Sequence, residues 1–377
     1  MLLLSQLRAL REQGYDVTGI SAPGDGVAEL EAAGISHFAV PFVRNTQLTP
    51  LADANALAHM VRVFRRGRFD IVHTHTAKPD LYAAMAARLA GVPCVVSTLH
   101  GFLFHELTPP KRRRFYAGLA KVGMRFCDTV LSQNPEDVTT AIAERICPAS
   151  KIEYLGNGID LTRFDPTRID AQRVRGLKAE LGIAPDSLTV GFVGRLVEEK
   201  GVLELFAAIA QLRLRFPTIK LLIVGMIDRA KSDAIQPEVA DRFGIADLCI
   251  FTGHRDDMPE LYSAMDVCVL ASHREGYPRT VMEASAMSVP VVATNIRGCR
   301  TAVVEGRNGM LVPLKDPAKL AEAIGALLGD PARRRSIARQ ARTLAEGQFD
   351  ERVVFAHVLA TYDRLLSSRG DSRGIRS

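Results

Sequence analysis

The chain has no tryptophan, few cysteines and no long apolar run, and each absence excludes a class of protein. None of the six cysteines forms a CxxC pair, and several lie inside apolar, strand-like runs. This pattern argues against a disulfide framework or a zinc site and predicts reduced core thiols in a cytoplasmic protein. No apolar stretch approaches the roughly 20 residues that span a bilayer. The segment 1–8 also lacks the layout of a signal peptide.

Two nucleotide-binding motifs are also missing. There is no GxxxxGK[ST] loop and no GxGxxG opening a strand-to-helix turn, which argues against a P-loop nucleotidase and a dinucleotide enzyme. The net charge of +6 allows an anionic partner, such as nucleic acid, phospholipid or a diphosphate substrate. Nucleic acid is disfavoured, because no reading motif and no aromatic interleaving accompany the basic residues.

Apolar strand-like runs alternate with amphipathic helical stretches almost throughout the chain. Near-continuous Val, Ile and Leu strands between helices predict parallel sheets covered on both faces. The predicted strands are 16–21, 37–40, 70–74, 94–98, 129–132, 152–154, 189–193, 220–224, 249–251, 267–270, 291–293 and 310–312. The predicted helices include 2–13, 51–66, 80–90, 111–126, 202–216 and 279–288.

A chain of 377 residues is too long for one typical core. We therefore predict an α/β fold of two doubly wound, Rossmann-like domains whose strand ends face a ligand cleft. The irregular stretch 156–186 is the predicted linker, and the domains are placed at 1–160 and 161–349. The helical tail, about 350–367, is expected to pack back on the first domain.

The first domain lacks its opening strand. The chain starts on the predicted helix 2–13, whereas a doubly wound domain normally begins with a strand and a Gly-rich turn that lead into such a helix. We hypothesise that the natural reading frame starts earlier or that this copy is truncated. The intact mass of the natively expressed protein tests the first version.

Two carboxylates frame a strand–turn–helix segment in the second half. Glu275 follows the strand 267–270, at the strand end where open α/β sheets bind ligands, and Glu283 lies in the following helix. Such a pair can accept hydrogen bonds from the hydroxyls of a sugar and a ribose. The alternative is a loop glutamate and a solvated helix glutamate.

A basic loop lies between the strand 189–193 and the helix 202–216. Arg195 and Lys200 stand at the strand end and the helix start, where the helix dipole already favours anions. A departing diphosphate needs its developing charge neutralised, and two fixed cations supply that. The alternative is a solvated basic loop.

These segments together resemble the nucleotide-sugar domain of retaining GT-B glycosyltransferases, and glycosyltransferase family 4 in particular. The resemblance rests on VGRLVEEKG at 193–201, EGYPRTVMEA at 275–284 and SVPVVATNIRGCRTAVVEGRNGMLVP at 288–313. It implies that Arg195 and Lys200 bind the donor diphosphate, that Glu275 contacts the donor sugar, and that Glu283 binds ribose hydroxyls. The resemblance also implies donor contacts from Gly276, Tyr277, Thr280 and His254.

The N-terminal half carries weaker signals. The STLHG segment resembles the family's His-Gly element, which implies that His100 lies near the reaction centre; otherwise a lone histidine at a strand end is more often structural. His73 and His75 alternate onto one face, but no third ligand with suitable spacing supports a metal site. The segment 157–160, NGID, matches the family's interdomain element and is interpreted as structural or as cleft lining.

The helix 111–126 is basic and amphipathic and follows an apolar segment. It begins with Lys111, Arg112, Arg113 and Arg114. A basic helix of this kind can dock on an anionic membrane and approach a lipid-linked acceptor. The alternative is an ordinary surface helix.

The resemblance implies a glycosyltransferase that moves a hexose or N-acetylhexosamine from a nucleoside diphosphate donor, with UDP as the expected nucleotide. It implies retention of configuration, no cofactor and no obligatory metal. The expected acceptor is a glycan or a polyprenyl-diphosphate-linked glycan, in polysaccharide, lipopolysaccharide or capsule synthesis at the cytoplasmic membrane face. The alternatives are a nucleotide-sugar epimerase, a phosphorylase, or a non-catalytic nucleotide-sugar-binding subunit, which a natural lack of the first strand would favour.

Overall fold

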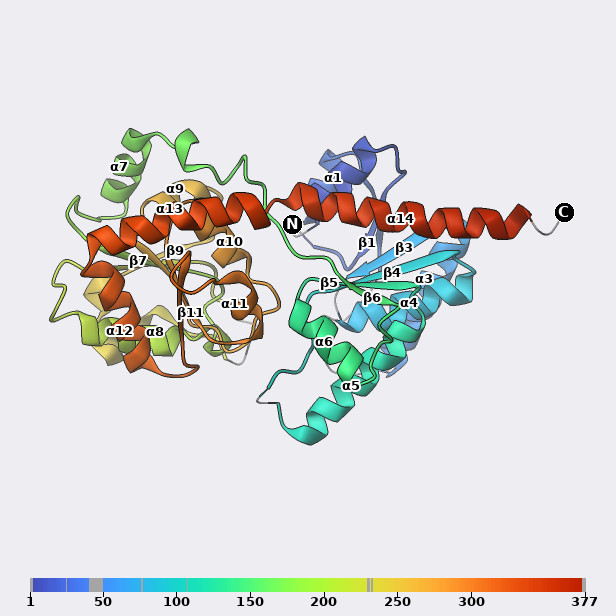
Figure 1. The fold of residues 1–377 in the computed structure, drawn as a ribbon, viewed down its shortest axis with the longest axis horizontal. Helices are drawn as coiled ribbons and strands as arrows, with labels where there is room; N and C mark the ends of the chain where they lie inside the picture. Colours follow the sequence, from blue (N-terminus) through green and yellow to red (C-terminus); the bar gives the residue numbers. More distant parts are fainter. Residues whose placement is uncertain are drawn as a thin grey trace. The chain divides into compact units, whose positions relative to one another are not determined.

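The computed structural model describes residues 3–24, 26–40, 50–75, 77–106, 108–228, 231 and 233–374. The chain divides into two compact units (Figure 1). The N-terminal unit consists of Met1–Gly156 together with Arg352–Ser377, and the C-terminal unit of Asn157–Glu351. Each unit has its own parallel β-structure and its own hydrophobic core.

The described strands of the N-terminal unit form two separate parallel sheets, β1-β2 and β3-β4-β5-β6. The strands are β1 (Thr18–Ser21), β2 (Ser36–Ala39), β3 (Ile71–His75), β4 (Cys94–Leu99), β5 (Thr129–Ser132) and β6 (Ile152–Tyr154). The helices are α1 (Leu4–Glu12), α2 (Gly26–Ala32), α3 (Pro50–Gly67), α4 (Ala77–Ala90), α5 (Pro110–Arg125), α6 (Pro135–Ala143) and α14 (Glu351–Gly374). The first described element is a helix, as predicted; Leu2, where the prediction begins it, lies outside the described residues.

Helices cover both faces of the four-stranded sheet because its side chains alternate between them. Val95 of β4 packs in a cluster with Met60 and Phe64 of α3, whereas the next residue, Val96, packs with Leu10 of α1 and Val358 of α14. Figure 1 shows α14 running along this unit, with α4, α5 and α6 on the other side of the strands. The C-terminal helix is therefore part of the core of the N-terminal unit.

The C-terminal unit has one parallel sheet in the order β12-β11-β10-β7-β8-β9. Its strands are β7 (Thr189–Val193), β8 (Lys220–Val224), β9 (Cys249–Gly253), β10 (Val267–Leu270), β11 (Val291–Thr294) and β12 (Gly309–Val312). Its α-helices are α7 (Ala171–Glu180), α8 (Val202–Leu212), α9 (Met258–Ser263), α10 (Arg279–Ala286), α11 (Arg297–Ala302), α12 (Pro317–Leu328) and α13 (Pro331–Gln348). Short 3-10 helices are η1 (Pro166–Arg168), η2 (Glu198–Lys200), η3 (Pro237–Phe243) and η4 (Ala246–Leu248).

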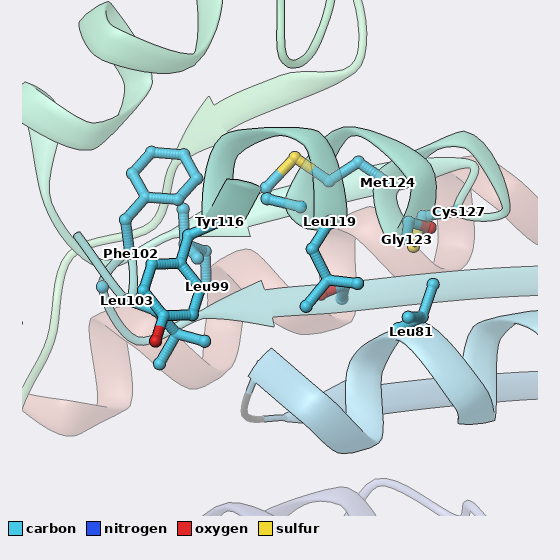
Figure 2. A pocket seen from close by; sticks show the side chains of 12 residues that line it. Leu81, Leu99, Phe102, Leu103, Tyr116, Leu119, Gly123, Met124 and Cys127 are labelled. Atoms are coloured by element: carbon cyan, nitrogen blue, oxygen red, sulfur yellow. Dashed lines mark hydrogen bonds between the residues drawn. The ribbon is translucent and has the colours of Figure 1, made fainter. Parts of the chain in front are cut away.

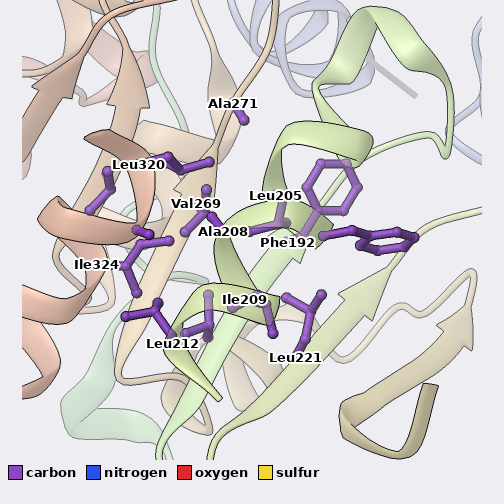
Figure 3. Packing of buried hydrophobic residues seen from close by; sticks show 14 of the residues in the cluster. Phe192, Leu205, Ala208, Ile209, Leu212, Leu221, Val269, Ala271, Leu320 and Ile324 are labelled. Carbon is purple, nitrogen blue, oxygen red and sulfur yellow. The ribbon is translucent and has the colours of Figure 1, made fainter. Parts of the chain in front are cut away.

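Successive side chains along the strands of this sheet also point into two different helical layers. Val292 of β11 packs with α8 and α12, and its neighbour Val291 packs with α9, α10 and α13. Figure 3 shows the first layer, where Phe192 of β7 meets Leu205 and Ile209 of α8. Full burial of an aliphatic or aromatic side chain contributes roughly 1.5–3 kcal/mol. The predicted architecture of two doubly wound parallel-sheet units is confirmed.

The predicted helix end at residue 216 is wrong. The helix predicted over 202–216 stops at Leu212, and Arg213 is its C-cap residue. Pro217 explains why a helix could not run to Phe216, because the residue before a proline is driven out of the helical region.

Candidate active site

The centre of the C-terminal sheet is a topological switch point. β7 pairs with both β10 and β8, so the chain order reverses between β7 and β10. Open α/β sheets bind ligands at such a point, beyond the carboxyl ends of the strands. The loop after β7 carries Arg195 and Lys200, and the loop after β10 carries Glu275. The topology therefore brings the basic loop and the first carboxylate to one edge of the sheet.

Two glycines let neighbouring loops approach the Glu275 loop closely. Gly201 has a φ of +68°, and a Cβ there would lie 2.0 Å from the carbonyl oxygen of Ala271. A Cβ on Gly298 would lie 2.7 Å from the carbonyl oxygen of Glu275. Any larger residue at either position would push the backbone apart. The segment that ends β10 is thus packed between the start of α8 and the start of α11.

Lys200 and Glu275 form the central ion pair of the site. The Lys200 Nζ lies 2.6 Å from the Glu275 Oε1, and the two side chains are 20% and 13% exposed. The buried Ser272 hydroxyl donates to the same oxygen at 2.7 Å. Both partners hold Oε1, while Oε2 has no hydrogen-bond partner among the described residues. One carboxylate oxygen is therefore fixed and the other is available to a ligand.

Glu283 lies on the first turns of α10 and is largely buried. The Tyr262 hydroxyl donates to its Oε2 at 3.0 Å, and the Arg279 Nε lies 3.5 Å from its Oε1. Burial raises the pKa of the Glu283 carboxyl, and the charge of Arg279 and the Tyr262 hydrogen bond act against that rise. The second predicted carboxylate is thus a desolvated group, and the alternative of a solvated helix glutamate is wrong.

Arg195 is more exposed and is paired with a carboxylate that sequence reasoning missed. Its guanidinium Nη1 lies 2.9 Å from the Asp228 Oδ2, and the side chains are 48% and 28% exposed. Asp228 belongs to the segment that follows β8, the strand next to β7. The pair places Arg195 at the strand edge, within reach of solvent.

An outer layer of ion pairs ties the two loops together. The His273 Nε2 lies 2.7 Å from the Glu204 Oε1, and the Arg274 Nε donates to the Glu199 Oε1 at 2.7 Å. Burial raises the pKa of the Glu199 carboxyl, but the Arg274 hydrogen bond and charge outweigh it, so the net shift is downward. The sequence position of Ser272, His273 and Arg274, directly after β10, was the available signal for these missed residues.

The other residues predicted to contact the donor sugar nucleotide fall into two groups. Three lie beside the Glu275 loop or the end of β7, whereas His254 makes its contact after β9. The Thr280 hydroxyl, in the first turn of α10, donates to the Val193 carbonyl at 3.4 Å, and the Tyr277 carbonyl accepts from the Asn157 amide at 3.4 Å. Gly276 follows Glu275 directly and packs against Gly298. His254 is 69% exposed after β9 and lies 3.5 Å from Asp256. Within the described residues, no hydrogen bond or ion pair joins His254 to Glu275, Glu283, Arg195 or Lys200.

The NGID segment holds its own turn. The Asn157 side-chain oxygen accepts from the Gly158 backbone at 2.9 Å, and the Asp160 Oδ1 accepts from the backbone of Thr162 at 2.8 Å. Gly158 also packs directly against the backbone at Glu351. These contacts favour the structural interpretation.

In the N-terminal unit the three predicted histidines form one cluster at the carboxyl ends of β3 and β4. The His75 Nδ1 lies 3.1 Å from the His100 Nε2, and the His73 ring stacks on His75 with centroids 4.3 Å apart. The His100 Nδ1 lies 3.0 Å from the Gln133 Oε1. The His73 ring nitrogens each lie 2.7 Å from a hydroxyl, that of Tyr362 and that of Thr98.

Burial keeps this cluster neutral. Desolvation lowers the pKa of His73 to about 3 and lowers the pKa of His75 well below its usual value. The pKa of His100 is also lowered by burial, and its Gln133 hydrogen bond opposes the shift. The N-terminal unit therefore presents uncharged imidazoles at its sheet edge.

The basic helix α5 carries an exposed stripe at helical spacing. Lys111, Arg114, Phe115, Lys121 and Val122 are all exposed, with Phe115 at 54% and Val122 at 45%. Arg112 is exposed beside them. Arg113 turns away from this stripe, because it pairs with Glu144 and its guanidinium lies over the Phe104 ring at 4.7 Å from the centroid. Three of the four predicted basic residues at the helix start thus face solvent.

The inner face of α5 borders an apolar pocket. Leu81, Leu99, Phe102, Tyr116 and Leu119 line it between α4, β4 and α5 (Figure 2). Its cavity volume is about 40 Å³, against roughly 300–1,000 Å³ for small-molecule sites. It holds a few water molecules at most, so it is a packing gap and not a sugar site.

Among the described residues, no helix is both long and apolar enough to cross a membrane. In the same part of the chain, no group of three or more His, Cys, Asp or Glu side chains is arranged to hold a metal ion.

Comparison with known families identifies the chain. The family model described as Glycosyltransferase Family 4 matches residues 2–163, and the model described as Glycosyl transferases group 1 matches residues 187–330. A D-inositol 3-phosphate glycosyltransferase of Arthrobacter sp. (strain FB24) is 30% identical over 334 residues, covering 85% of this chain and 77% of the relative. The chain belongs to glycosyltransferase family 4. It is a glycosyltransferase, and the expected family is confirmed.

The names of two other relatives refer to a lipid-linked acceptor and to capsular polysaccharide synthesis. A UDP-Gal:alpha-D-GlcNAc-diphosphoundecaprenol alpha-1,3-galactosyltransferase of Escherichia coli is 29% identical over 318 residues, covering 83% of this chain and 80% of the relative. The capsular polysaccharide biosynthesis glycosyltransferase CapM of Staphylococcus aureus is 27% identical over 372 residues, covering 97% and 94%. The crystal structure of Anabaena Alr3699/HepE in complex with UDP-glucose shares the fold, with a TM-score of 0.80, 24% identity and coverage of 96% and 95%.

Proposed function

We propose that this glycosyltransferase moves a hexose or N-acetylhexosamine from a UDP-sugar to a lipid-linked glycan, with retention of anomeric configuration, in cell-surface polysaccharide or glycolipid synthesis. The observation that carries the proposal is the Lys200–Glu275 pair at the switch point, with one carboxylate oxygen free. A cation and an acceptor side by side fit a ligand that carries a diphosphate next to a sugar.

The charges at this edge suit a departing diphosphate. When the bond between the sugar C1 and the phosphate oxygen breaks, that oxygen gains negative charge, which preorganised cations stabilise. Lys200 is held at 2.6 Å by Glu275, so its position requires little reorganisation, and Arg195 stands on the same loop. In the proposed complex both cations face the diphosphate, and Arg195 exchanges Asp228 for phosphate oxygens.

The two carboxylates then bind hydroxyls of the donor. The free Oε2 of Glu275 would accept from a sugar hydroxyl, because its other oxygen is already engaged by Ser272 and Lys200. Glu283 would accept from the ribose hydroxyls, in line with the family resemblance. The same resemblance supports retention, contacts from Gly276, Tyr277, Thr280 and His254, and transfer that needs no bound metal or other cofactor.

The lipid-linked acceptor rests on two observations. The name of the Escherichia coli relative specifies a diphosphoundecaprenol-linked acceptor and a UDP-Gal donor. The exposed stripe of α5 combines Lys111, Arg114 and Lys121 with Phe115 and Val122, which suits an anionic membrane surface. We place the protein at the cytoplasmic face of the membrane, attached through this stripe, and assign no nucleic-acid partner.

The test is donor-dependent transfer by the purified full chain. UDP release is measured with UDP-glucose, UDP-galactose, UDP-N-acetylglucosamine and UDP-N-acetylgalactosamine, and with GDP-mannose as the control donor. Each is assayed with and without N-acetylglucosamine linked through diphosphate to a short polyprenyl chain, and with EDTA. The product is analysed by proton NMR.

We expect UDP release with one UDP-sugar, dependent on acceptor and unaffected by EDTA, and an α-linked product. Conversion of the donor sugar without acceptor would instead identify an epimerase. Tight UDP-sugar binding without any release would identify a binding subunit. A β-linked product would overturn retention alone.

A further inference from the structure

Glu199 is a carboxylate without a role in the proposed donor complex, although it directly precedes Lys200 in the chain. It lies in η2, on the loop that follows β7, and its side chain is 32% exposed. An anionic side chain beside a bound diphosphate is unfavourable, because like charges repel. The contacts of Glu199 therefore determine whether it interferes with donor binding.

Glu199 lies close enough to Lys200 to compete with Glu275 for its ammonium group. Burial raises the pKa of the Glu199 carboxyl, and the Arg274 hydrogen bond and charge lower it. The charges of Lys200 and Lys231 also lower it, and the net shift is downward. The Lys200 Nζ has three N–H donors and only the Glu275 Oε1, at 2.6 Å, as a partner among the described residues. A second carboxylate nearby can therefore draw the same ammonium toward itself.

Arg274 engages that second carboxylate. Its Nε donates to the Glu199 Oε1 at 2.7 Å, and the two side chains are 38% and 32% exposed. Arg274 directly precedes Glu275, just as Glu199 directly precedes Lys200, so two ion pairs link the same two loops. Each carboxylate has its own cation in this arrangement, and Lys200 is left to Glu275.

The backbone of the two loops is held by contacts that do not involve the Arg274 side chain. The His273 N–H donates to the Glu199 carbonyl at 2.8 Å, and the His273 Nε2 lies 2.7 Å from the Glu204 Oε1 in the first turn of α8. Gly201 packs against the backbone that follows β10. Replacing Arg274 should therefore release the Glu199 side chain and leave the loops in place.

We propose that Arg274 is a positioning residue, which binds Glu199 and so keeps this carboxylate from drawing Lys200 away from Glu275 and from the donor diphosphate. The inference rests on the proposed function for its diphosphate. A preorganised cation is effective because it needs no rearrangement when charge develops on the leaving group. A Lys200 shared between two carboxylates would lose that advantage.

The test is a double-mutant cycle in the full chain with Arg274→Met, Glu199→Gln and the double variant. UDP release gives kcat and donor KM, and thermal unfolding checks the fold. We expect Arg274→Met to lower kcat by about tenfold, less than the removal of Lys200 itself, because the cation stays nearby. Adding Glu199→Gln should restore most of the lost kcat, because the competing charge is then gone.

The direction of this coupling separates a positioning role from the other roles that Arg274 could have. If Arg274 bound the donor itself or only supported the fold, Glu199→Gln would not restore activity in the Arg274→Met background, and the proposal would be overturned. Arg274→Lys keeps a cation facing Glu199 and should retain most of the parent kcat.

The matched control is Arg213→Met in the same unit. Arg213 donates to both carboxylate oxygens of Asp247, at 2.7 and 2.8 Å, near the amino end of β9 and not at the carboxyl edge of the sheet. Its removal should leave kcat and donor KM at the parent level. Equal losses in Arg213→Met and Arg274→Met would assign both to general destabilisation and overturn the proposal.

A crystal structure of the free Arg274→Met variant separates this inference from the proposed function. We expect the Lys200 Nζ within hydrogen-bond distance of the Glu199 carboxylate and no longer on the Glu275 Oε1. A Lys200 that stays on Glu275, with Glu199 turned to Lys231 or to solvent, would overturn the inference alone. A displaced Lys200 in a chain whose parent form releases no UDP from any UDP-sugar would refute the proposed function alone.

Discussion

The two units present opposite chemistry at equivalent places, the carboxyl ends of their parallel strands. The C-terminal unit holds fixed charges, with the Lys200–Glu275 pair at 2.6 Å and the buried Glu283 beside it. The N-terminal unit holds neutral imidazoles at its sheet edge and carries exposed cations on the outside of α5. On the proposed function, this contrast assigns diphosphate binding to the charged site of the C-terminal unit and membrane attachment to α5 of the N-terminal unit.

Replacing Lys200 in the charged site of the C-terminal unit should cause the largest loss of activity. Lys200→Ala removes the fixed cation that we propose faces the leaving diphosphate, and we expect kcat to fall by about 10²–10³-fold, the usual loss for one preorganised electrostatic group. Donor KM should change less, because the leaving-group charge develops only in the transition state. Steady-state UDP release measures both constants.

The matched control for this variant is Lys319→Ala. Lys319 also forms an ion pair, with Glu322 at 2.7 Å, but both side chains are exposed, at 57% and 69%. Exposed pairs contribute little, so activity and stability should stay at the parent level. An unchanged kcat in Lys200→Ala would refute the leaving-group role.

The next prediction concerns the outer surface of the N-terminal unit. The triple variant Lys111→Gln, Arg114→Gln, Lys121→Gln should lose about 100-fold in affinity for phosphatidylglycerol vesicles, since each basic residue near an anionic surface contributes roughly 1 kcal/mol. Binding of the parent chain should weaken with salt. Vesicle co-sedimentation at two ionic strengths measures the effect.

Charge elsewhere on the molecule should not matter in the same assay. Arg335 and Arg339 of α13 are exposed cations of the C-terminal unit, so Arg335→Gln with Arg339→Gln lowers net charge away from α5. This variant should bind vesicles as the parent does. Equal losses in both variants would mean that net charge, and not the α5 stripe, sets membrane affinity.

In both units the sequence predicted strands better than helix ends. The strands at 129–132, 152–154, 189–193, 220–224 and 267–270 were predicted residue for residue. Four of these five strands have a strong apolar signal and are buried or mostly buried in a parallel sheet, whereas β6 ends the order of its described sheet and only its Ile152 is buried. The α8 end was misplaced because helical periodicity continued past Leu212, while Pro217 determined the outcome.

The side-chain partners could not be predicted in the same way. Glu275 and Lys200 are 75 residues apart in sequence, and motif spacing was sufficient to link them because both follow central strands. Tyr262 and Gln133 carried no motif, since their roles depend on which strand ends and helices lie beside them. The hydrogen-bond partners within the histidine cluster likewise depend on how the ends of β3 and β4 lie together.

Replacing Tyr262 should have the smallest effect, a shift in the pH dependence of donor kcat/KM. Tyr262 of α9 donates to Glu283, whose pKa is raised by burial and lowered by Arg279 and by this bond. Arg163 also lowers it, while the Cys268 thiol facing the carboxylate stays protonated because burial raises its pKa to about 12. Tyr262→Phe should therefore raise the Glu283 pKa further and move the acidic limb of donor kcat/KM to higher pH, with near-parent activity above it.

The direction of the pH effect depends on which protonation state of Glu283 binds the donor. In the proposed complex ionised Glu283 accepts the ribose hydroxyls, so donor binding should be gained as pH rises through its pKa. Stability changes in the opposite sense, because a carboxyl whose native pKa is raised disfavours its charged form: stability is lost as pH rises from the unfolded to the native pKa. Tyr82→Phe is the control from the N-terminal unit, since that hydroxyl donates to Asp53 at 3.1 Å, away from any donor contact. If the acidic limb of the pH profile moved equally in both variants, the cause would be a general loss of packing. The proposed role of Glu283 in donor binding would then be refuted.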